Sequence, residues 1–316
     1  MRDMKITSRL LIWPVIIIAI LAILATFPTY LPSYTIILIT SILMYIILTV
    51  SWSLFSGPTG YTSLGTAAFF GVGVYIAATV GKILPMPVVI LAGALASFLL
   101  GLIAGAITLR LRGIYFTIFT LGMVELIKQL LLWYEVNITH TRGRFVVVID
   151  NTTIYYVILI IFVALMLMVF FIRQSKYGLA LQSIGENEEA SGHIGVNTTT
   201  LKVITFAVSA FFMGATGAIM ATKWTYIDPY IAFNLPLFSF TPVVMAVFGG
   251  IGQIYGPLLG AAIFAYLQET LITQFPYYYM LLFGLILVIV ILFLPRGISD
   301  LIDKWRKTGF GRNHVD

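Results

Sequence analysis

Cysteine is absent from this chain, histidine is rare, and charged side chains are few. Without cysteine there is no disulfide, no thiolate metal site and no cysteine nucleophile. The histidines, His140, His193 and His314, stand far apart, so the sequence shows no clustered metal site. Charged residues make up 9% of the chain, whereas a soluble globular protein carries about a quarter. The composition argues against an ordinary soluble enzyme.

The usual motifs of ATPases and hydrolases are also missing. No Gly-x-x-x-x-Gly-Lys-Ser/Thr phosphate loop occurs, because Gly81-Lys82 is followed by Ile83 and lacks the upstream glycine. There is no His-Glu-x-x-His zinc motif and no Gly-x-Ser-x-Gly nucleophile elbow. The sequence therefore predicts neither an ATPase nor another enzyme, and no cofactor is expected in this chain.

Apolar residues make up 60% of the chain and gather in long runs. A helix that crosses a bilayer takes about 20 apolar residues, so the chain has room for about ten. We expect an all-α fold, a polytopic bundle of membrane helices in which the short run Leu237–Phe248 is a partial or broken span. The ten predicted spans are Leu10–Phe27, Tyr34–Phe55, Tyr61–Val80, Val88–Leu109, Ile114–Tyr134, Ile154–Ile172, Val203–Ala221, Leu237–Phe248, Pro257–Phe275 and Tyr278–Leu294.

Basic residues flank these runs and predict the orientation. A net charge of +6 suggests nucleic acid in a soluble protein, but membrane-flanking Lys and Arg instead mark the cytoplasmic side, so no nucleic-acid partner is expected. With ten spans, or with eight, both termini are cytoplasmic. We expect a single domain, residues 1–316, in the cell membrane, with a basic cytoplasmic tail at 295–316. The cytoplasmic set is Arg2, Lys5, Arg9, Arg110, Arg112, Arg173, Lys176, Lys202, Arg296, Lys304, Arg306, Lys307 and Arg312, and the outer set is Lys82, Arg142, Arg144 and Lys223.

The predicted cytoplasmic loop 173–202 is the longest polar stretch of the chain. Its residues Ala180, Ile184, Glu188, Ser191 and Gly195 recur at spacings of three and four, which favours a helix with one apolar and small face. Gly192 or Gly195 is expected to end that helix in a left-handed conformation. Periodicity alone leaves two readings open, a solvated connector and a helix that docks a partner.

The motif Glu189-Ala190-Ser191-x-x-x-Gly195 resembles the Glu-Ala-Ala-x-x-x-Gly loop of ABC-importer permeases. In that family the loop forms a coupling helix seated in a groove of the ATPase subunit. The resemblance implies that Glu188, Glu189, Ala190, Ser191 and Gly195 form the ATPase-coupling site. The small residues would allow close approach, and the two carboxylates would meet basic groups of the partner.

Further stretches resemble the branched-chain amino acid type of these permeases, the LivM-like branch. They occur in the family's order and include the run from Gly57-Pro58-Thr59-Gly60 to Tyr75, Leu111-Arg112-Gly113-Ile114-Tyr115-Phe116, Gly249-Gly250 through Ala261, and Leu294-Pro295-Arg296-Gly297. Two residues depart from the pattern: Tyr61 stands where the family has Gln, and Thr66 where it has His. Both changes remove polar groups near a possible path, which leaves the substrate in doubt.

This resemblance implies a permease subunit of an ATP-driven importer. The implied partners are a second permease subunit, two ATPase subunits that bind ATP and Mg, an extracytoplasmic solute-binding protein and the lipid bilayer. The implied substrates are leucine, isoleucine or valine, and related permeases that import urea or short amides are the closest alternative.

Glycines are the next group of candidate residues. Gly252, Gly256 and Gly260 are four apart, so in a helix they share one face and allow close helix packing, with Pro257 near the helix start. The alternative is that this stretch and the turn at Gly57–Gly60 form broken helices that line a path. Gly57, Gly60 and Ser63 are therefore candidates for the translocation path.

Glu125 and Lys128 are charged residues in the middle of a predicted span. With Gln129 they form a polar face at spacings i, i+3 and i+4, and an ionisable group at that depth should be paired and face the bundle interior. The pair is either structural or part of the translocation path. It also allows a different class of function, an ion-coupled secondary transporter that needs no ATPase.

Overall fold

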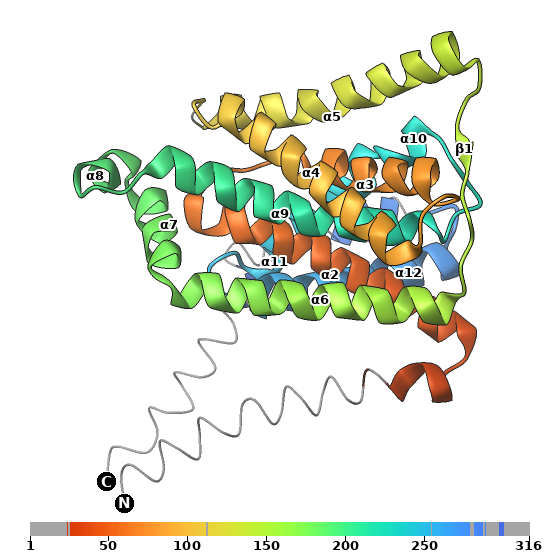
Figure 1. Ribbon diagram of the computed structural model, residues 1–316. Helices are drawn as coiled ribbons and strands as arrows, with labels where there is room; N and C mark the ends of the chain where they lie inside the picture. Colours follow the sequence, from red (N-terminus) through yellow and green to blue (C-terminus); the bar gives the residue numbers. More distant parts are fainter. Residues whose placement is uncertain are drawn as a thin grey trace, which may run out of the picture.

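A computed structural model describes residues 24, 26–111, 113–253, 255–278, 281–286, 288 and 297–299. Long helices dominate this part of the chain and run roughly side by side (Figure 1). The α-helices are α2 (Ser33–Thr59), α3 (Thr66–Val80), α4 (Met86–Thr108), α5 (Ile114–Tyr134), α6 (Asn151–Gln174), α7 (Lys176–Glu186), α8 (Glu188–His193), α9 (Thr198–Ala221), α10 (Pro229–Ala232), α11 (Thr241–Gly249) and α12 (Tyr255–Gln274). The π-helical segments are η1 (Glu135–Thr139) and η2 (Pro236–Phe240), and the short strands β1 (Arg144–Phe145) and β2 (Tyr226–Ile227) pair antiparallel.

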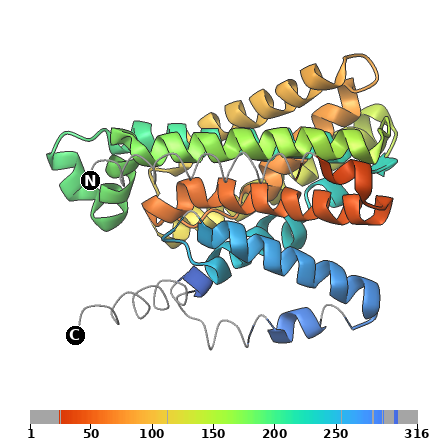
Figure 2. The same cartoon turned by 90° about the horizontal axis from the view of Figure 1, so that it is seen from below.

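The bundle has two distinct ends. Figure 1 shows α7 and α8 at one of them, which we call the loop end, and β1 at the other, which we call the strand end. Seen from below, α6, α2 and α12 lie side by side (Figure 2), in agreement with their contacts. Residues that flank the same end are therefore brought together although they are distant in sequence.

Helices α2 and α9 form the centre of the bundle. In their most apolar stretches 67% of α2 and 78% of α9 are buried, against 22% for the helical run α5–η1 at the edge. Small residues let α9 approach its neighbours: a Cβ at Gly73 of α3 would collide with the carbonyl oxygen of Gly214 in α9, and one at Gly214 would collide with Ser97 of α4. Such small-residue contacts are the usual means of close helix packing in membranes.

Six of the described helical runs are long and apolar enough to cross a membrane, and they make this a multi-pass membrane protein. They are Ser33–Thr59, Met86–Thr108, Ile114–Thr139, Asn151–Gln174, Thr198–Ala221 and Pro229–Gly249. The all-α bundle is confirmed. The predicted span Leu10–Phe27 lies mostly outside the described residues, as do much of Tyr278–Leu294 and nearly all of the tail 295–316. The count of ten spans stays a prediction.

Three predicted elements differ from the structure. The span predicted from Tyr61 begins only at Thr66, because α2 ends at Gly60 in a left-handed conformation (φ 72°) and residues 60–65 belong to no helix or strand. The short run Leu237–Phe248 belongs to the longer interrupted segment Pro229–Gly249. The single helix expected across the 173–202 loop is instead two helices, α7 and α8, separated at Asn187.

Candidate functional site

The loop end is organised by the break between α7 and α8. Asn187 takes an extended backbone (φ −159°), and its side-chain oxygen caps α8 by accepting a hydrogen bond from the Ala190 N–H at 3.0 Å. At the other end of α8, Gly195 has φ 90° and donates to the Gly192 carbonyl, while the Val196 N–H reaches the Ser191 carbonyl, both at 3.1 Å. This is a Schellman ending. The expectation that a glycine ends this helix is confirmed for Gly195.

The five predicted coupling residues do not share one surface. Ser191 is buried against α7, where its hydroxyl donates to the Asn187 carbonyl at 2.8 Å and lies 3.1 Å from the hydroxyl of Ser183. Glu188 is partly buried and turns toward Lys202 of α9, and its expected role of meeting basic groups on a partner stays a prediction. Glu189, Ala190 and Gly195 remain exposed. Glu188 and Ser191 are three residues apart and share one face of α8, whereas Glu189 follows Glu188 directly and so points to another side.

Glu188 forms a buried ion pair with Lys202 of α9. The Lys202 ammonium is 2.6 Å from Glu188 Oε1, 3.2 Å from the Tyr61 hydroxyl and 3.2 Å from the Leu109 carbonyl oxygen. Three N–H donors thus meet three acceptors. The Tyr61 hydroxyl donates to Glu188 Oε2 at 2.6 Å, and the ammonium lies 4.5 Å from the centre of the Tyr61 ring. Lys202 is 1% exposed, so removal of one partner would strand a buried charge.

The turn at Gly57–Tyr61 packs directly against this loop. A Cβ at Gly185 in α7 would collide with the carbonyl oxygen of Pro58, so the two backbones are in contact. Two cavities flank the contact, one of about 310 Å³ that includes Gly60 and Glu188 and one of about 350 Å³ that includes Gly57 and Gly252. The structure therefore brings the predicted path residues Gly57 and Gly60 next to the predicted coupling loop.

Residues 60–65, which we call the 60–65 segment, connect α2 to α3 without helix or strand and are held mainly by side chains of α2, α5 and η2. Trp52 Nε1 donates to the Ser63 carbonyl at 2.7 Å, and Thr117 Oγ1 to the Thr62 carbonyl at 2.8 Å. The Leu64 N–H donates to Thr120 Oγ1 at 2.9 Å. Non-helical backbone inside a membrane protein is tolerated only where the protein satisfies its polar groups, and here side chains bind three of them, the Thr62 and Ser63 carbonyls and the Leu64 N–H.

Ser239 of η2 joins the 60–65 segment to the interrupted segment Pro229–Gly249, of which η2 is a part. Its hydroxyl donates to the Leu64 carbonyl at 2.7 Å and accepts from the Ala67 N–H at 2.9 Å. Ser63, a predicted path residue, is buried, and its hydroxyl accepts from the Gly65 N–H at 3.2 Å. The alternative of broken helices thus describes the geometry of the 57–65 stretch better than ordinary helix packing.

Residues 34–291 match the family described as "Branched-chain amino acid transport system / permease component". The chain belongs to this family. The match covers the loop 173–202, the 60–65 segment and the interrupted segment Pro229–Gly249. The chain is therefore a permease component, and its multi-pass helical bundle is what such a component requires.

Individual relatives agree with this assignment. Over 94% of its length the permease is 27% identical to the LivM high-affinity branched-chain amino acid transport permease protein of Salmonella typhimurium, covering 77% of that protein. The LivM protein of Escherichia coli is likewise 27% identical, over 89% of this chain and 74% of its own. The LivH permease protein of Escherichia coli is 32% identical over 42% of each chain. No solved structure matches the chain.

Glu125 and Lys128 do form an ion pair in the permease, at 2.6 Å, and Gln129 donates to Glu125 at 3.0 Å. The pair does not face the closed interior of the bundle, however, because the Glu125 side chain is 43% exposed. Lys128 instead lies 5.4 Å from the ring centre of Tyr230 in α10. The reason is the position of α5 at the edge, where little of the chain covers it.

The three spaced glycines also separate. In α12, a Cβ at Gly256 would collide with the Gly250 carbonyl oxygen and one at Gly260 with the Met245 carbonyl oxygen, so these two allow α11 and α12 to touch. Gly252 lies before α12, is exposed, and has no heavy atom in reach of a Cβ. Its expected role in packing is wrong, because the helix starts three residues later.

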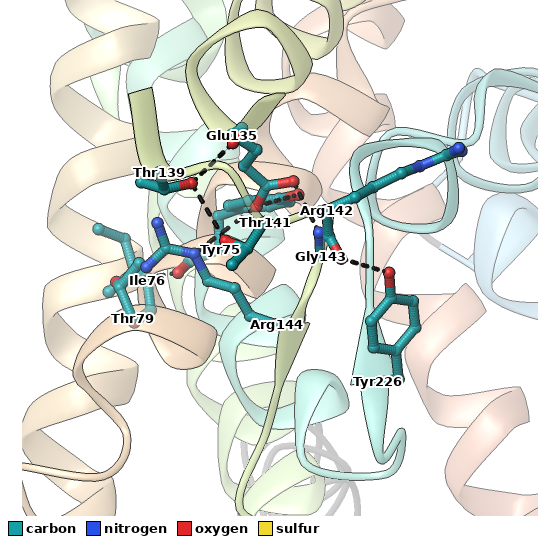
Figure 3. A network of polar contacts seen from close by, with 10 residues as sticks. All are labelled: Tyr75, Ile76, Thr79, Glu135, Thr139, Thr141, Arg142, Gly143, Arg144 and Tyr226. Carbon is teal, nitrogen blue, oxygen red and sulfur yellow. Dashed lines mark hydrogen bonds and ion pairs between the residues drawn. The ribbon is translucent and has the colours of Figure 1, made fainter. Parts of the chain in front are cut away.

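At the strand end a buried carboxylate holds the loop that follows η1 (Figure 3). Glu135 is 1% exposed and accepts from the Tyr75 hydroxyl at 3.3 Å and from the Gly143 N–H at 2.9 Å. The Arg144 Nε lies 3.6 Å from the same side chain. The loop after η1 is thereby tied to α3. Among the described residues no group of three or more His, Asp or Glu side chains is arranged to hold a metal ion.

Sequence reasoning missed several residues that the structure makes central. Tyr61 was read as the loss of a polar group, whereas its hydroxyl bridges Glu188 and Lys202. Lys202 was counted only as a charge that sets orientation. Trp52 and Ser239 carry no motif, and only the Gly-Pro-Thr-Gly turn after α2 signals that a backbone break needs such partners.

Proposed function

We propose that this permease is one of two permease subunits of an ATP-driven ABC importer of leucine, isoleucine or valine. The support is the family together with its LivM and LivH relatives, which are named as permease proteins of high-affinity branched-chain amino acid transport. Similarity to both kinds of subunit favours a pair of permeases. An importer of urea or short amides is the alternative within the same architecture.

In this proposal the loop end is cytoplasmic. The distribution of Lys and Arg supports that orientation, with about ten spans and both termini inside as parts of one domain, residues 1–316. The strand end then faces the solute-binding protein. The loop 173–202 meets the ATPase subunits, which bind the ATP and Mg, and this chain itself carries no cofactor and no catalytic residue.

The observation that carries the coupling role is the mounting of α8. Its inner side is fixed by Glu188 and Ser191, and its outer side presents Glu189 and Ala190 with Ile194 76% exposed. A short helix that is held rigidly on one side and exposes small and apolar residues on the other is suited to dock into a groove of a partner. Gly60 lines the same cavity as Glu188, and Gly57 lines the neighbouring cavity against α7, which supports a path that the loop can control.

The coupling role can be tested at Gly192, which is helical, exposed and has no neighbour within reach of a Cβ. Gly192→Glu should leave folding and membrane insertion intact and abolish ATP-driven leucine uptake in cells or proteoliposomes, because a large charged side chain obstructs docking. Gly192→Ala is the control and should retain uptake, since alanine favours the helix.

Gly195 is a poorer test position, because any side chain there strains the φ 90° backbone whether or not a partner docks. Full uptake by a correctly inserted Gly192→Glu variant would contradict the docking role. Competition of leucine uptake by isoleucine and valine, but not by urea or acetamide, is the result expected for the branched-chain substrate.

A further inference from the structure

Tyr61 lies where the 60–65 segment meets both α8 and α9. Its hydroxyl lies between Glu188 on α8 and Lys202 on α9, and its backbone is part of the 60–65 segment. The side chain is 9% exposed. One residue thus belongs both to the segment and to the support of the coupling helix.

The contacts around Tyr61 leave little freedom for α8 to move alone. Glu188 accepts from both Lys202 and Tyr61, at 2.6 Å each, and Lys202 also donates to the Leu109 carbonyl at the end of α4. Movement of α8 away from Tyr61 breaks a hydrogen bond to a charged group. Movement away from Lys202 leaves a buried charge unpaired. A displacement of α8 is therefore transmitted through this network more easily than it is absorbed there.

On its other side Tyr61 is joined to the bundle core. Its ring lies 5.5 Å from that of Phe116 in α5, edge-on, and 6.4 Å from that of Phe55 in α2. The next residues continue to Leu64, whose carbonyl is bound by Ser239 of the second interrupted run. The contacts form an unbroken route from α8 to both interrupted segments.

We propose that Tyr61 is a positioning residue that transmits movement of the coupling helix α8 to the 60–65 segment. This inference rests on the proposed function. In an importer this link makes ATP-driven movement at the loop end change the conformation of the segment next to the path. Loss of the Tyr61 hydroxyl then uncouples the two: the ATPases still dock on α8 and hydrolyse ATP, but less of that hydrolysis moves substrate.

The test is Tyr61→Phe in the complete importer reconstituted in proteoliposomes, with ATP hydrolysis and leucine uptake measured on the same preparation. The ring packing is retained and only the hydroxyl is lost. We expect hydrolysis to stay near the unmodified rate and uptake per ATP to fall about tenfold, the scale of one hydrogen bond to a charged group.

Tyr75→Phe is the matched control. It removes a tyrosine hydroxyl from another buried carboxylate, Glu135, at the strand end. It should lower the melting temperature to a similar degree and leave uptake per ATP unchanged. If Tyr61→Phe also changes only the melting temperature, Tyr61 is merely structural and the proposal is overturned.

A second measurement does not depend on uptake. Because the chain has no cysteine, Thr62→Cys and His193→Cys, both exposed, can carry a pair of spin labels on the segment and on α8. The distance between them should be the same with and without trapped ATP in the Tyr61 protein and should differ between the two states in Tyr61→Phe. Equal behaviour of both proteins would overturn the link, whereas a parent complex that lacks ATPase subunits would overturn the proposed function instead.

Discussion

At the scale of single residues, the charged side chains that are buried in the described part of the chain, Glu135 and Lys202, are each paired. Lys202 with Glu188 holds the loop end, and Glu135 with Tyr75 and Arg144 holds the strand end. Each site ties a loop to the helices. An unpaired charge in such surroundings costs several kcal/mol, so these pairs fix where the loops sit.

The Glu125–Lys128 pair allows a direct test of whether it is structural. Glu125→Ala leaves Lys128 without its carboxylate in a membrane span, at a cost of about 2–3 kcal/mol. The double variant with Lys128→Ala removes that cost. We expect the single variant to have a lower melting temperature and lower yield than the double variant in detergent-purified protein. Equal damage in both would mean that Glu125 acts in some way other than as the partner of Lys128.

Residue types predicted part of this chemistry. The i, i+3 spacing of Glu125 and Lys128 was sufficient to predict their pairing, since helix geometry alone brings them together. Tyr61, Glu188 and Lys202 are separated by up to 141 positions, and nothing in the chain states which lysine meets which carboxylate. Their network depends on how α2 and α9 pack, which hydrophobic patterning does not specify.

At the scale of elements, the two interrupted runs stabilise one another through Ser239. In Ser239→Ala the Leu64 carbonyl and the Ala67 N–H both lose their partner, and each unsatisfied buried group costs about 1–3 kcal/mol. We expect a clear drop in the melting temperature of the purified permease.

Ser209→Ala is the matched control, because Ser209 is equally buried but its hydroxyl bonds only the Phe206 carbonyl of its own helix. That change should alter the melting temperature little. A similar fall in melting temperature in both variants would show that the stability of the 60–65 segment does not depend on Ser239.

Long apolar runs predicted the positions of α2, α4, α5, α6 and α9 to within a few residues, because length and hydropathy largely determine a membrane helix. The sequence predicted a turn at Gly57–Gly60, with broken helices as one of two interpretations, but not that the break continues to residue 65. Hydropathy does not show that Trp52 and Thr117 bind the backbone there. The division of the loop at Asn187 was missed for a similar reason: the spacing of Ala180, Ile184 and Glu188 continues across it, while the cap on Ala190 is a local contact.

At the scale of the whole molecule, the bundle has the short helix α8 at one end and the loop after η1 at the other. Helices α2 and α9 and the 60–65 segment connect the two ends. Helix α5 remains largely uncovered, with apolar side chains such as Ile118, Leu126 and Leu130 exposed. The family and the lipid-facing composition follow from the sequence. The partner chains do not, because their contacts depend on surfaces that are not in this chain.

The most direct test of the account is purification of the tagged permease from its native membrane in mild detergent, with the accompanying proteins identified and ATP hydrolysis assayed. We expect recovery of a second permease and ATPase subunits, with hydrolysis stimulated by a leucine-loaded solute-binding protein. Recovery of the chain alone, without ATP hydrolysis, under conditions that preserve a known ABC importer, would contradict it and favour an ion-coupled transporter.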